Sequence, residues 1–291
     1  MGKIVCNGVE LYYRSAGQGS DIILIHGLAA NHAFWRFDVL MALAKHYRVT
    51  VFDLRGHGYS DMPSSGYTSY DMAEDLNCLI SNLNISRAHL VGHSFGGVVA
   101  LQYALKYPGR IASLTIADSR VRALQPTNYP GNWADSKTVL KKLEEIGLSV
   151  PQDEAESGLW ILEQLASPKW QNMRDKLKGT SLFIPFGGRH GGQKSAERWR
   201  ELMNTTTARK DMLSMAGLTT DRLSTIEKPT LAIYGEKSPA LHSVEGLKEH
   251  LPNCRTTIVP GAGHFHPFTQ PKIFVETLSQ FLNEIKEVKV S

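Results

Sequence analysis

The sequence has 291 residues, 42% of them hydrophobic, and its 32 basic side chains nearly balance 28 acidic ones. This length predicts one large core, organised as a single domain that carries an insertion. The net charge of +4 comes without a dense run of Lys and Arg, which argues against a nucleic-acid-binding surface. We find no apolar N-terminal segment and no run of about 18 apolar residues, so a soluble, cytoplasmic protein without a membrane span is expected.

The three cysteines are scattered along the chain. Cys6, Cys78 and Cys254 form no CxxC pair, and their number is odd. A disulfide framework or a zinc site would need a different count or spacing. We therefore expect ordinary thiols in or near the core.

In the first part of the chain, short apolar runs alternate with helical patterns. Strands are predicted over 9–14, 22–25, 49–52, 88–91 and 113–117, and the alternation within 9–14 is typical of an edge strand. Helices are predicted over 37–46, 71–83 and 98–105. Runs that are apolar throughout suit strands buried on both faces, and their alternation with helices predicts an α/β fold with a doubly wound, mostly parallel sheet.

The pattern changes after Asp118. The stretch up to about Arg222 lacks buried strands and contains several helical segments broken by prolines. Strands resume over 230–234 and 256–259, and a helix over 273–285 closes the chain. We therefore predict a helical lid over 119–222, inserted between the two halves of a core made of 1–118 and 223–291.

The predicted lid is rich in large apolar side chains. They include Trp133, Trp160, Trp170, Trp199, Met203, Met212 and Met215. Such residues either form a core of the lid itself or line an apolar pocket for an acyl chain, where flexible methionines would suit varied chains. We expect a mixture of the two.

A serine between two glycines is the most informative motif. Gly92-His93-Ser94-Phe95-Gly96 lies between a predicted strand and a predicted helix. A strand that turns sharply into a helix strains the middle residue and requires small residues on either side. The turn would present Ser94 as an exposed nucleophile, which needs a nearby imidazole as base and a carboxylate to orient that imidazole.

A glycine-rich turn offers two candidates for the base. His264 and His266 follow the predicted strand 256–259, at the edge of the sheet where active sites of open α/β folds lie. The residues alone do not separate these two histidines.

Together these motifs resemble the α/β-hydrolase superfamily, in particular its capped serine hydrolases. The serine motif is similar to the nucleophile elbow of that fold, and the turn after 256–259 resembles its catalytic-histidine loop, which favours His264. His26-Gly27-Leu28 looks like the oxyanion loop. The resemblance implies that the backbone N–H groups of Leu28 and Phe95 bind the oxyanion. Residues 53–60 are similar to the Asp-x-Arg-Gly-x-Gly-x-Ser stretch, to which we assign a structural turn.

The acid departs from the commonest family pattern. Many relatives carry it three residues after the glycine that ends the last strand but one, and that position is Ser238 here. Another group, which includes haloalkane dehalogenases, carries it directly after the strand that follows the elbow helix. The resemblance therefore implies Asp118 as the acid, with Glu236 as the alternative.

The resemblance implies a serine hydrolase that cleaves carboxylic esters through an acyl-enzyme, with Ser94, His264 and Asp118 as its catalytic residues. Hydrolysis of acyl-thioesters, with an acyl carrier as a possible substrate, and hydrolysis of C–C bonds are alternatives. A non-catalytic small-molecule receptor is a further one. We expect a small-molecule acyl substrate, no cofactor, no metal and no nucleic acid, in a monomer or a homodimer.

Overall fold

The computed structural model describes residues 1–126, 136–145, 147, 157–167 and 191–288. At its centre is an eight-stranded sheet in the order β1-β2-β4-β3-β5-β6-β7-β8. The strands are β1 (Gly2–Cys6), β2 (Val9–Ala16), β3 (Asp21–Ile25), β4 (Arg48–Phe52), β5 (Ala88–His93), β6 (Ile111–Ala117), β7 (Thr230–Gly235) and β8 (Cys254–Val259). The strands from β4 to β8 in this order run parallel, whereas β2 pairs antiparallel with β1 and β4. The predicted mostly parallel sheet is confirmed.

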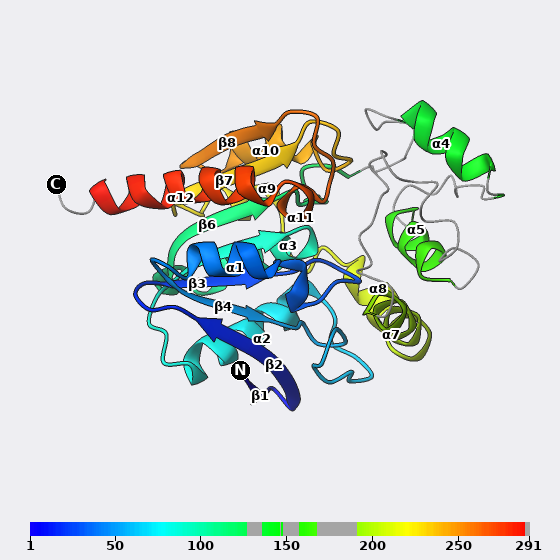
Figure 1. The fold of residues 1–291 in the computed structure, drawn as a ribbon, viewed down its shortest axis with the longest axis horizontal. Helices are drawn as coiled ribbons and strands as arrows, with labels where there is room; N and C mark the ends of the chain where they lie inside the picture. Colours follow the sequence, from blue (N-terminus) through cyan, green and yellow to red (C-terminus); the bar gives the residue numbers. More distant parts are fainter. Residues whose placement is uncertain (127–135, 146, 148–156, 168–190, 289–291) are drawn as a thin grey trace.

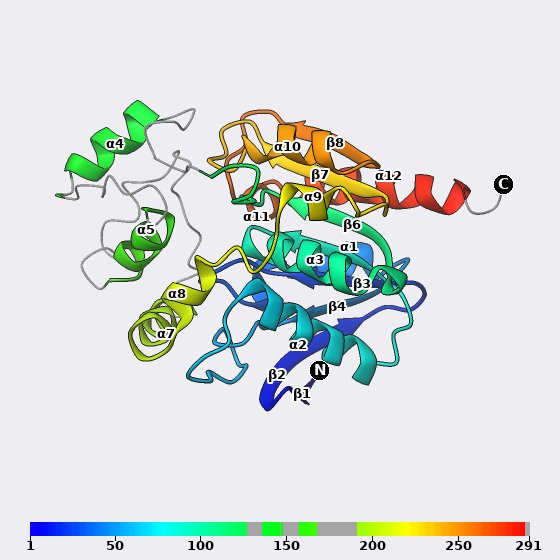
Figure 2. The same cartoon turned by 180° about the vertical axis from the view of Figure 1, so that it is seen from behind.

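Helices cover both faces of the sheet. The described helices of the core are α1 (Phe37–Leu43), α2 (Ser69–Asn82), α3 (Phe95–Lys106), α9 (Thr220–Leu223), α10 (Ser243–His250), α11 (His266–Thr269) and α12 (Pro271–Val288), with 3₁₀ turns η1 (His32–Phe34) and η2 (Pro108–Arg110). Helices α1 and α12 lie side by side over one face (Figure 1). Helices α2 and α3 pack together over the other face, as Figure 2 shows from behind. This layering leaves the central strands without contact to water.

The central strands are buried on both sides, which explains their sequences. Every residue of β5, β6 and β7 is buried, and so are four of the five residues in β3. On the face of α1 and α12, a cluster of apolar side chains joins Val39 and Leu43 to Phe274, Leu278 and Phe281. Burial on both faces demands apolar side chains at successive positions rather than at alternate ones.

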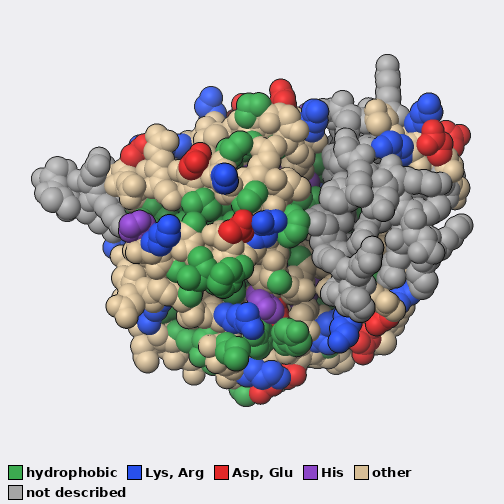
Figure 3. All heavy atoms as spheres, in the orientation of Figure 1, with side chains coloured by type: hydrophobic (Ala, Val, Ile, Leu, Met, Phe, Trp, Pro, Cys, Tyr) green, Lys and Arg blue, Asp and Glu red, His purple; other side chains and the backbone are tan. Residues whose placement is uncertain are grey.

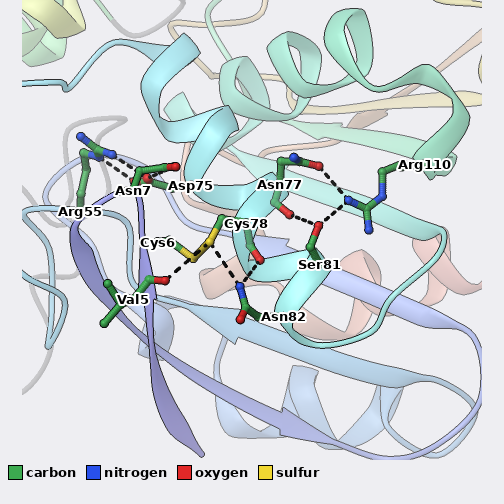
Figure 4. Close-up of a disulfide and its surroundings, with 10 residues drawn as sticks. All are labelled: Val5, Cys6, Asn7, Arg55, Asp75, Asn77, Cys78, Ser81, Asn82 and Arg110. Carbon is green, nitrogen blue, oxygen red and sulfur yellow. Dashed lines mark hydrogen bonds and ion pairs between the residues drawn. A yellow bond between two sulfur atoms is a disulfide. The ribbon is translucent and has the colours of Figure 1, made fainter.

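Two expectations for the N-terminal region are wrong. The edge strand is β1, which we did not predict, and β2 lies inside it. Cys6 of β1 and Cys78 of α2 are joined in a disulfide with a Cα–Cα distance of 5.5 Å (Figure 4). An odd number of cysteines does not suggest a disulfide. The two partners are also 72 residues apart in sequence and meet only once α2 packs against β1. Cys254 remains a free thiol.

A buried ion pair lies next to this disulfide. Arg55 donates from Nε and Nη2 to the two carboxylate oxygens of Asp75 on α2, each at 2.6 Å (Figure 4). Asn7, which follows β1, donates to the same carboxylate at 3.1 Å. The pair satisfies both charges, which a buried carboxylate requires. It fixes the turn after β4 to the helix beneath it.

Between β6 and β7 the described elements are all helical. They are α4 (Ser136–Glu145), α5 (Ser157–Ala166), α7 (Gly191–Thr205), α8 (Ala208–Met212) and α9, so the predicted end of the lid at residue 222 falls inside α9. Helices α4, α5, α7 and α8 lie beside the sheet, at the side toward which the arrows of β6 and β7 point (Figure 1). Their role as a lid remains a prediction. Trp133 and Trp170 lie outside the described residues.

Side chains of both charges are interspersed on the face covered by α1 and α12 (Figure 3). This face therefore carries no broad surface of one sign, in keeping with the nearly balanced composition. Among the described helices, none has the length and hydropathy required to cross a membrane.

Candidate active site

Ser94 lies at the sharp turn between β5 and α3. Its backbone has φ of 54° and ψ of −124°, a conformation that L-residues rarely adopt. Such strain persists only where the surroundings fix it. A Cβ on Gly92 would run into the backbone of Gly96, and a Cβ on Gly96 would run into the carbonyl of Ile25. Close backbone packing therefore explains why glycines flank the serine.

The loop after β3 passes directly beside this turn. Strand β3 pairs with β5, with Ile25 opposite Gly92, so the residues that follow Ile25 meet the serine. A Cβ on Gly27 would stand 2.8 Å from the Cβ of Ser94. Glycine at this position allows the two segments to approach.

Two backbone N–H groups flank Ser94 without a hydrogen-bond partner in the described part of the chain. One belongs to Phe95, the first residue of α3, where helical N–H groups have no acceptor within the helix. The other belongs to Leu28, next to Gly27 in the loop after β3. These are the two amides that we expect to bind an oxyanion, and their role stays a prediction.

Asp118 directly follows β6, which lies between β5 and β7. Its side chain is fully buried. One carboxylate oxygen, Oδ2, accepts the N–H of Gly235 at 2.7 Å, and the other, Oδ1, accepts the hydroxyl of Ser238. Removing a carboxylate from water is costly unless its lone pairs are hydrogen-bonded, and these donors meet that need.

The turn after β8 brings His264 between Asp118 and Ser94. Its Nδ1 lies 2.9 Å from Oδ1 of Asp118, and its Nε2 lies 3.1 Å from the hydroxyl oxygen of Ser94. A carboxylate only accepts hydrogen bonds, so Nδ1 carries the proton and Nε2 is left to accept from the serine. Residues up to 170 apart in sequence thus form one hydrogen-bonded row.

The other candidates from the sequence lie differently. Glu236, the alternative acid, is exposed, and its Oε2 accepts the N–H of Gly261 at 2.7 Å. His266 is buried and addresses the far oxygen of the acid: its Nε2 lies 3.4 Å from Oδ2 of Asp118 and 3.3 Å from the carbonyl of Ile233. The geometry therefore brings together Ser94, His264 and Asp118.

A cavity of about 220 Å³ opens at Ser94 and His264. Apolar side chains form most of its described wall, namely Leu28, Phe95, Val98, Val121, Leu159, Ile161, Leu162, Met212, Leu213, Met215 and Leu218. Met212 and Met215 thus line the cavity, whereas Trp199 is buried in an apolar cluster that the helices after β6 share with the sheet, and not in a separate core of the lid. Arg120 and Arg122 also line it, and the described lining contains no Asp or Glu.

This sheet order, the turn at Ser94 and the insertion after β6 agree with a family comparison. The model of the α/β hydrolase fold matches residues 22–271. The chain belongs to the α/β-hydrolase fold family. The expected family resemblance is confirmed, and the match spans the strands from β3 to β8 together with the segment between β6 and β7.

Several curated members of the family are similar along most of their length. The pimeloyl-[acyl-carrier protein] methyl ester esterase of Aeromonas hydrophila is 28% identical over 91% of this chain and 96% of its own. The 3-oxoadipate enol-lactonase 1 of Acinetobacter baylyi is 25% identical over 91% and 89%. A relative from Pantoea ananatis is 40% identical over 111 residues, which span only 40% of that protein.

Solved structures agree on the fold. An N-acyl homoserine lactone degrading enzyme superposes with a TM-score of 0.68 at 25% identity, and the match covers 96% of this chain and all of that one. An epoxide hydrolase superposes with a TM-score of 0.70 at 21% identity.

Within the described residues of this α/β-hydrolase, no group of His, Cys, Asp and Glu is placed to hold a metal ion.

Two buried histidines of this α/β-hydrolase hold the loop after β3, a role that the sequence analysis missed. His57 donates from Nδ1 to the carbonyl of Arg55 at 2.9 Å and accepts the N–H of Ala29 at Nε2, at 3.3 Å. His26 donates to the carbonyl of Gly27 at 2.7 Å and accepts an N–H from the turn after β4 at 3.1 Å. The turn over 53–60 therefore positions the loop that carries Leu28. Histidines next to glycines in both motifs were the signal in the sequence.

A third buried histidine supports the turn that carries His264. His93 donates from Nε2 to the backbone carbonyl of His264 at 2.9 Å and stacks on Phe34 with ring centroids 4.3 Å apart. Burial lowers the pKa of His93 well below its ordinary value, and burial also lowers the pKa of His266. Both rings are therefore neutral and do not repel a positive charge on His264.

Proposed function

We propose that this α/β-hydrolase is a serine hydrolase that cleaves carboxylic esters through an acyl-enzyme. The observation that carries the proposal is the row from Ser94 through His264 to Asp118, with heavy-atom distances of 3.1 Å and 2.9 Å, at one end of an apolar cavity. A serine hydroxyl becomes an effective nucleophile when an oriented imidazole takes its proton.

In the first step the hydroxyl oxygen of Ser94 attacks the ester carbonyl. Nε2 of His264 takes the hydroxyl proton, and the positive charge on the ring is stabilised by Asp118. The carbonyl oxygen becomes an oxyanion next to the N–H groups of Leu28 and Phe95. Donors fixed in advance by the fold stabilise that charge without reorganising, which lowers the barrier.

In the second half of the reaction the same groups act on water. His264 first gives its proton to the leaving alcohol, which departs and leaves Ser94 acylated. The histidine then takes a proton from a water molecule, whose oxygen attacks the acyl carbonyl. Collapse of the second tetrahedral intermediate releases the acid and returns the proton to Ser94.

The names of two relatives support an ester as substrate. One is a methyl ester esterase and the other an enol-lactonase, so both by name act on a carboxylic ester bond, which is cyclic in a lactone. Hydrolysis of acyl-thioesters would use the same two half-reactions. No observation in the cavity favours thioester or C–C bond cleavage over ester cleavage.

A receptor without catalysis is the main alternative from another class. A binding protein needs the cavity but neither the strained backbone of Ser94 nor a hydrogen-bonded row behind it. Strain of this kind is costly and is kept where it serves a function. The geometry therefore favours turnover.

A fluorophosphonate probe together with an ester panel tests the proposal. The probe should label Ser94 covalently, and a panel of p-nitrophenyl esters, lactones and acyl-thioesters should show ester turnover. Ser94→Ala should lose both labelling and turnover while keeping its fold, because little packing depends on the hydroxyl. Failure of the wild-type chain to label or to turn over any ester would contradict the proposal.

A further inference from the structure

Arg122 is a cationic residue in the wall of the cavity whose hydrogen-bonding capacity is largely unused. It lies in the loop that follows β6, four residues after Asp118, and its Nη1 donates to the carbonyl of Leu213. Its Nε is buried and has no hydrogen-bond partner. Within the described residues no hydrogen bond involves its Nη2 and no acidic side chain pairs with it. An unpaired buried donor on a charged group is costly, so its presence calls for an explanation.

Other arginines of this chain show what the Nε–Nη2 edge of a guanidinium binds. Arg55 donates hydrogen bonds from Nε and Nη2 to the carboxylate oxygens of Asp75, each at 2.6 Å. Arg48 donates from the same two nitrogens to Asp21, at 2.5 Å and 3.0 Å. The N–H groups along this edge are parallel and match the spacing of carboxylate oxygens. In Arg122 the Nε of this edge is buried, and among the described residues no carboxylate pairs with its Nη2.

We propose that the guanidinium of Arg122 binds a carboxylate carried by the substrate, with Nη2 as the donor. The inference rests on the proposed ester hydrolysis and names its substrate class: esters that carry a second, free carboxylate at a distance from the bond that is cleaved. The ester carbonyl lies at Ser94, and the carboxylate reaches the wall that Arg122 lines.

The charge of the cavity suits such a substrate. Its described lining contains Arg120 and Arg122 but no Asp or Glu, while the remaining wall is mostly apolar. Arg120 donates to the carbonyls of Gln125 and Pro126, so it adds positive charge while its own N–H groups are engaged locally. A charge in an apolar wall acts more strongly than one in water. An anionic substrate is therefore favoured over a neutral one of the same length.

A purely structural role for Arg122 leads to a different expectation. Its contact with Leu213 connects the loop after β6 to the loop after α8, which are the two ends of the insertion. That contact uses one of the five N–H groups of a guanidinium. If this were the whole role, substitution would affect neutral and anionic esters alike.

Matched esters separate the two roles. We would measure kcat and KM for the monomethyl esters of glutarate, adipate and suberate beside methyl pentanoate, hexanoate and octanoate. The wild-type chain should prefer the best hemiester by about tenfold or more in kcat/KM, and Arg122→Gln should remove about ten- to hundredfold of that preference, mainly by raising KM. The preference of Arg122→Lys for the monomethyl esters should lie between the two, because lysine keeps the charge but lacks the planar guanidinium. Arg14→Gln, an exposed arginine on β2, is the control.

A binding measurement keeps the test independent of turnover. Monomethyl adipate should bind the Ser94→Ala variant about tenfold more tightly than dimethyl adipate does, and Ser94→Ala with Arg122→Gln should lose that difference. If neutral esters are hydrolysed and both Arg122 variants keep the wild-type ratio of kcat/KM between the monomethyl and the neutral esters, only the carboxylate site is overturned. Absence of all ester turnover would overturn the proposed function. The binding measurement, made by calorimetry, would then still test the carboxylate site.

Discussion

The carboxylate of Asp118 contacts four polar groups, more than a residue that only forms a turn requires. Its carboxylate receives the Gly235 N–H and the Ser238 hydroxyl and addresses both His264 and His266. Each contact fixes the direction of the oxygen that faces the imidazole. At the residue scale, the orientation of His264 therefore depends on this one side chain.

Substitution of each acidic residue should show whether Asp118 or Glu236 is the acid that orients His264. Asp118→Asn keeps the shape but favours the wrong tautomer of His264, so kcat should fall by roughly 10² to 10⁴. Glu236→Gln removes only a contact with the backbone of Gly261 and should cost less than about tenfold, or about 1.4 kcal/mol on the barrier. The measurement is kcat for an ester with both folded variants. The reverse ranking would show that the acid was assigned to the wrong residue.

The position of Ser238 predicts that the acid can be moved. Its hydroxyl already donates to Oδ1 of Asp118, the oxygen that faces His264. A carboxylate placed there by Ser238→Asp, combined with Asp118→Ser, should reach the same ring nitrogen. We expect the double variant to recover at least about tenfold in kcat over Asp118→Ser alone. Equal rates for the single and double variants, with both folded, would contradict this expectation.

At the scale of elements, the loop after β3 and the turn after β4 form one unit through His26 and His57. Burial lowers the pKa of His57 to about 3, so the ring stays neutral and keeps one donor and one acceptor. Those two groups meet the carbonyl of Arg55 and the N–H of Ala29. The loop that carries Leu28 is thus fixed by a turn that contributes no residue to the described lining of the cavity.

Removing this support should affect the chemical step more than binding. His57→Phe fills similar space but leaves both backbone groups without partners, so the Leu28 amide should lose its fixed position. We expect kcat to fall by about 10- to 100-fold, less than the ~10² to 10³ for deleting an oxyanion donor outright, with a smaller change in KM. For His57→Gln, which restores an acceptor, kcat should fall less. A raised KM at unchanged kcat for His57→Phe would exclude this positioning role.

At the scale of the whole molecule, buried neutral histidines predict the response of stability to acid. Burial lowers the pKa values of His26, His57, His93 and His266 in the folded state. An unfolded histidine takes up its proton near pH ~6.5. Below that pH the unfolded chain binds protons that the folded chain does not, so the free energy of unfolding must decrease as the pH falls.

The size of this effect can be measured by urea unfolding between about pH 7.5 and about pH 4.5. Each of these histidines should contribute a decrease of up to about 1.4 kcal/mol per pH unit below its unfolded pKa. His57→Phe should reduce the slope by up to one such contribution, whereas His46→Gln at an exposed position should leave it unchanged. A free energy of unfolding that stays constant over this range would contradict the expectation.

The α/β architecture and the mostly parallel pairing of its strands follow from local patterns. Uninterrupted apolar runs predict buried parallel strands, and the glycines around Ser94 predict the turn, because both depend on residues close together in sequence. The edge strand β1 escaped the same reasoning, since its alternation is weak and half of its side chains face water. The Cys6–Cys78 disulfide escaped it because no local pattern indicates which cysteines will meet.

By itself the sequence determined the turn at Ser94, the loop that carries His264, and the kind of sheet that holds them. The tertiary structure decided the contacts between those parts: which oxygen of Asp118 faces His264, where Glu236 lies, and that His26, His57 and His93 support the backbone around Ser94. It also placed Arg122 in the wall of the cavity, without an acidic partner among the described residues. The physical reason is distance along the chain. Backbone strain and hydrophobic periodicity are local, whereas a hydrogen bond between residues 146 apart exists only once the strands have paired.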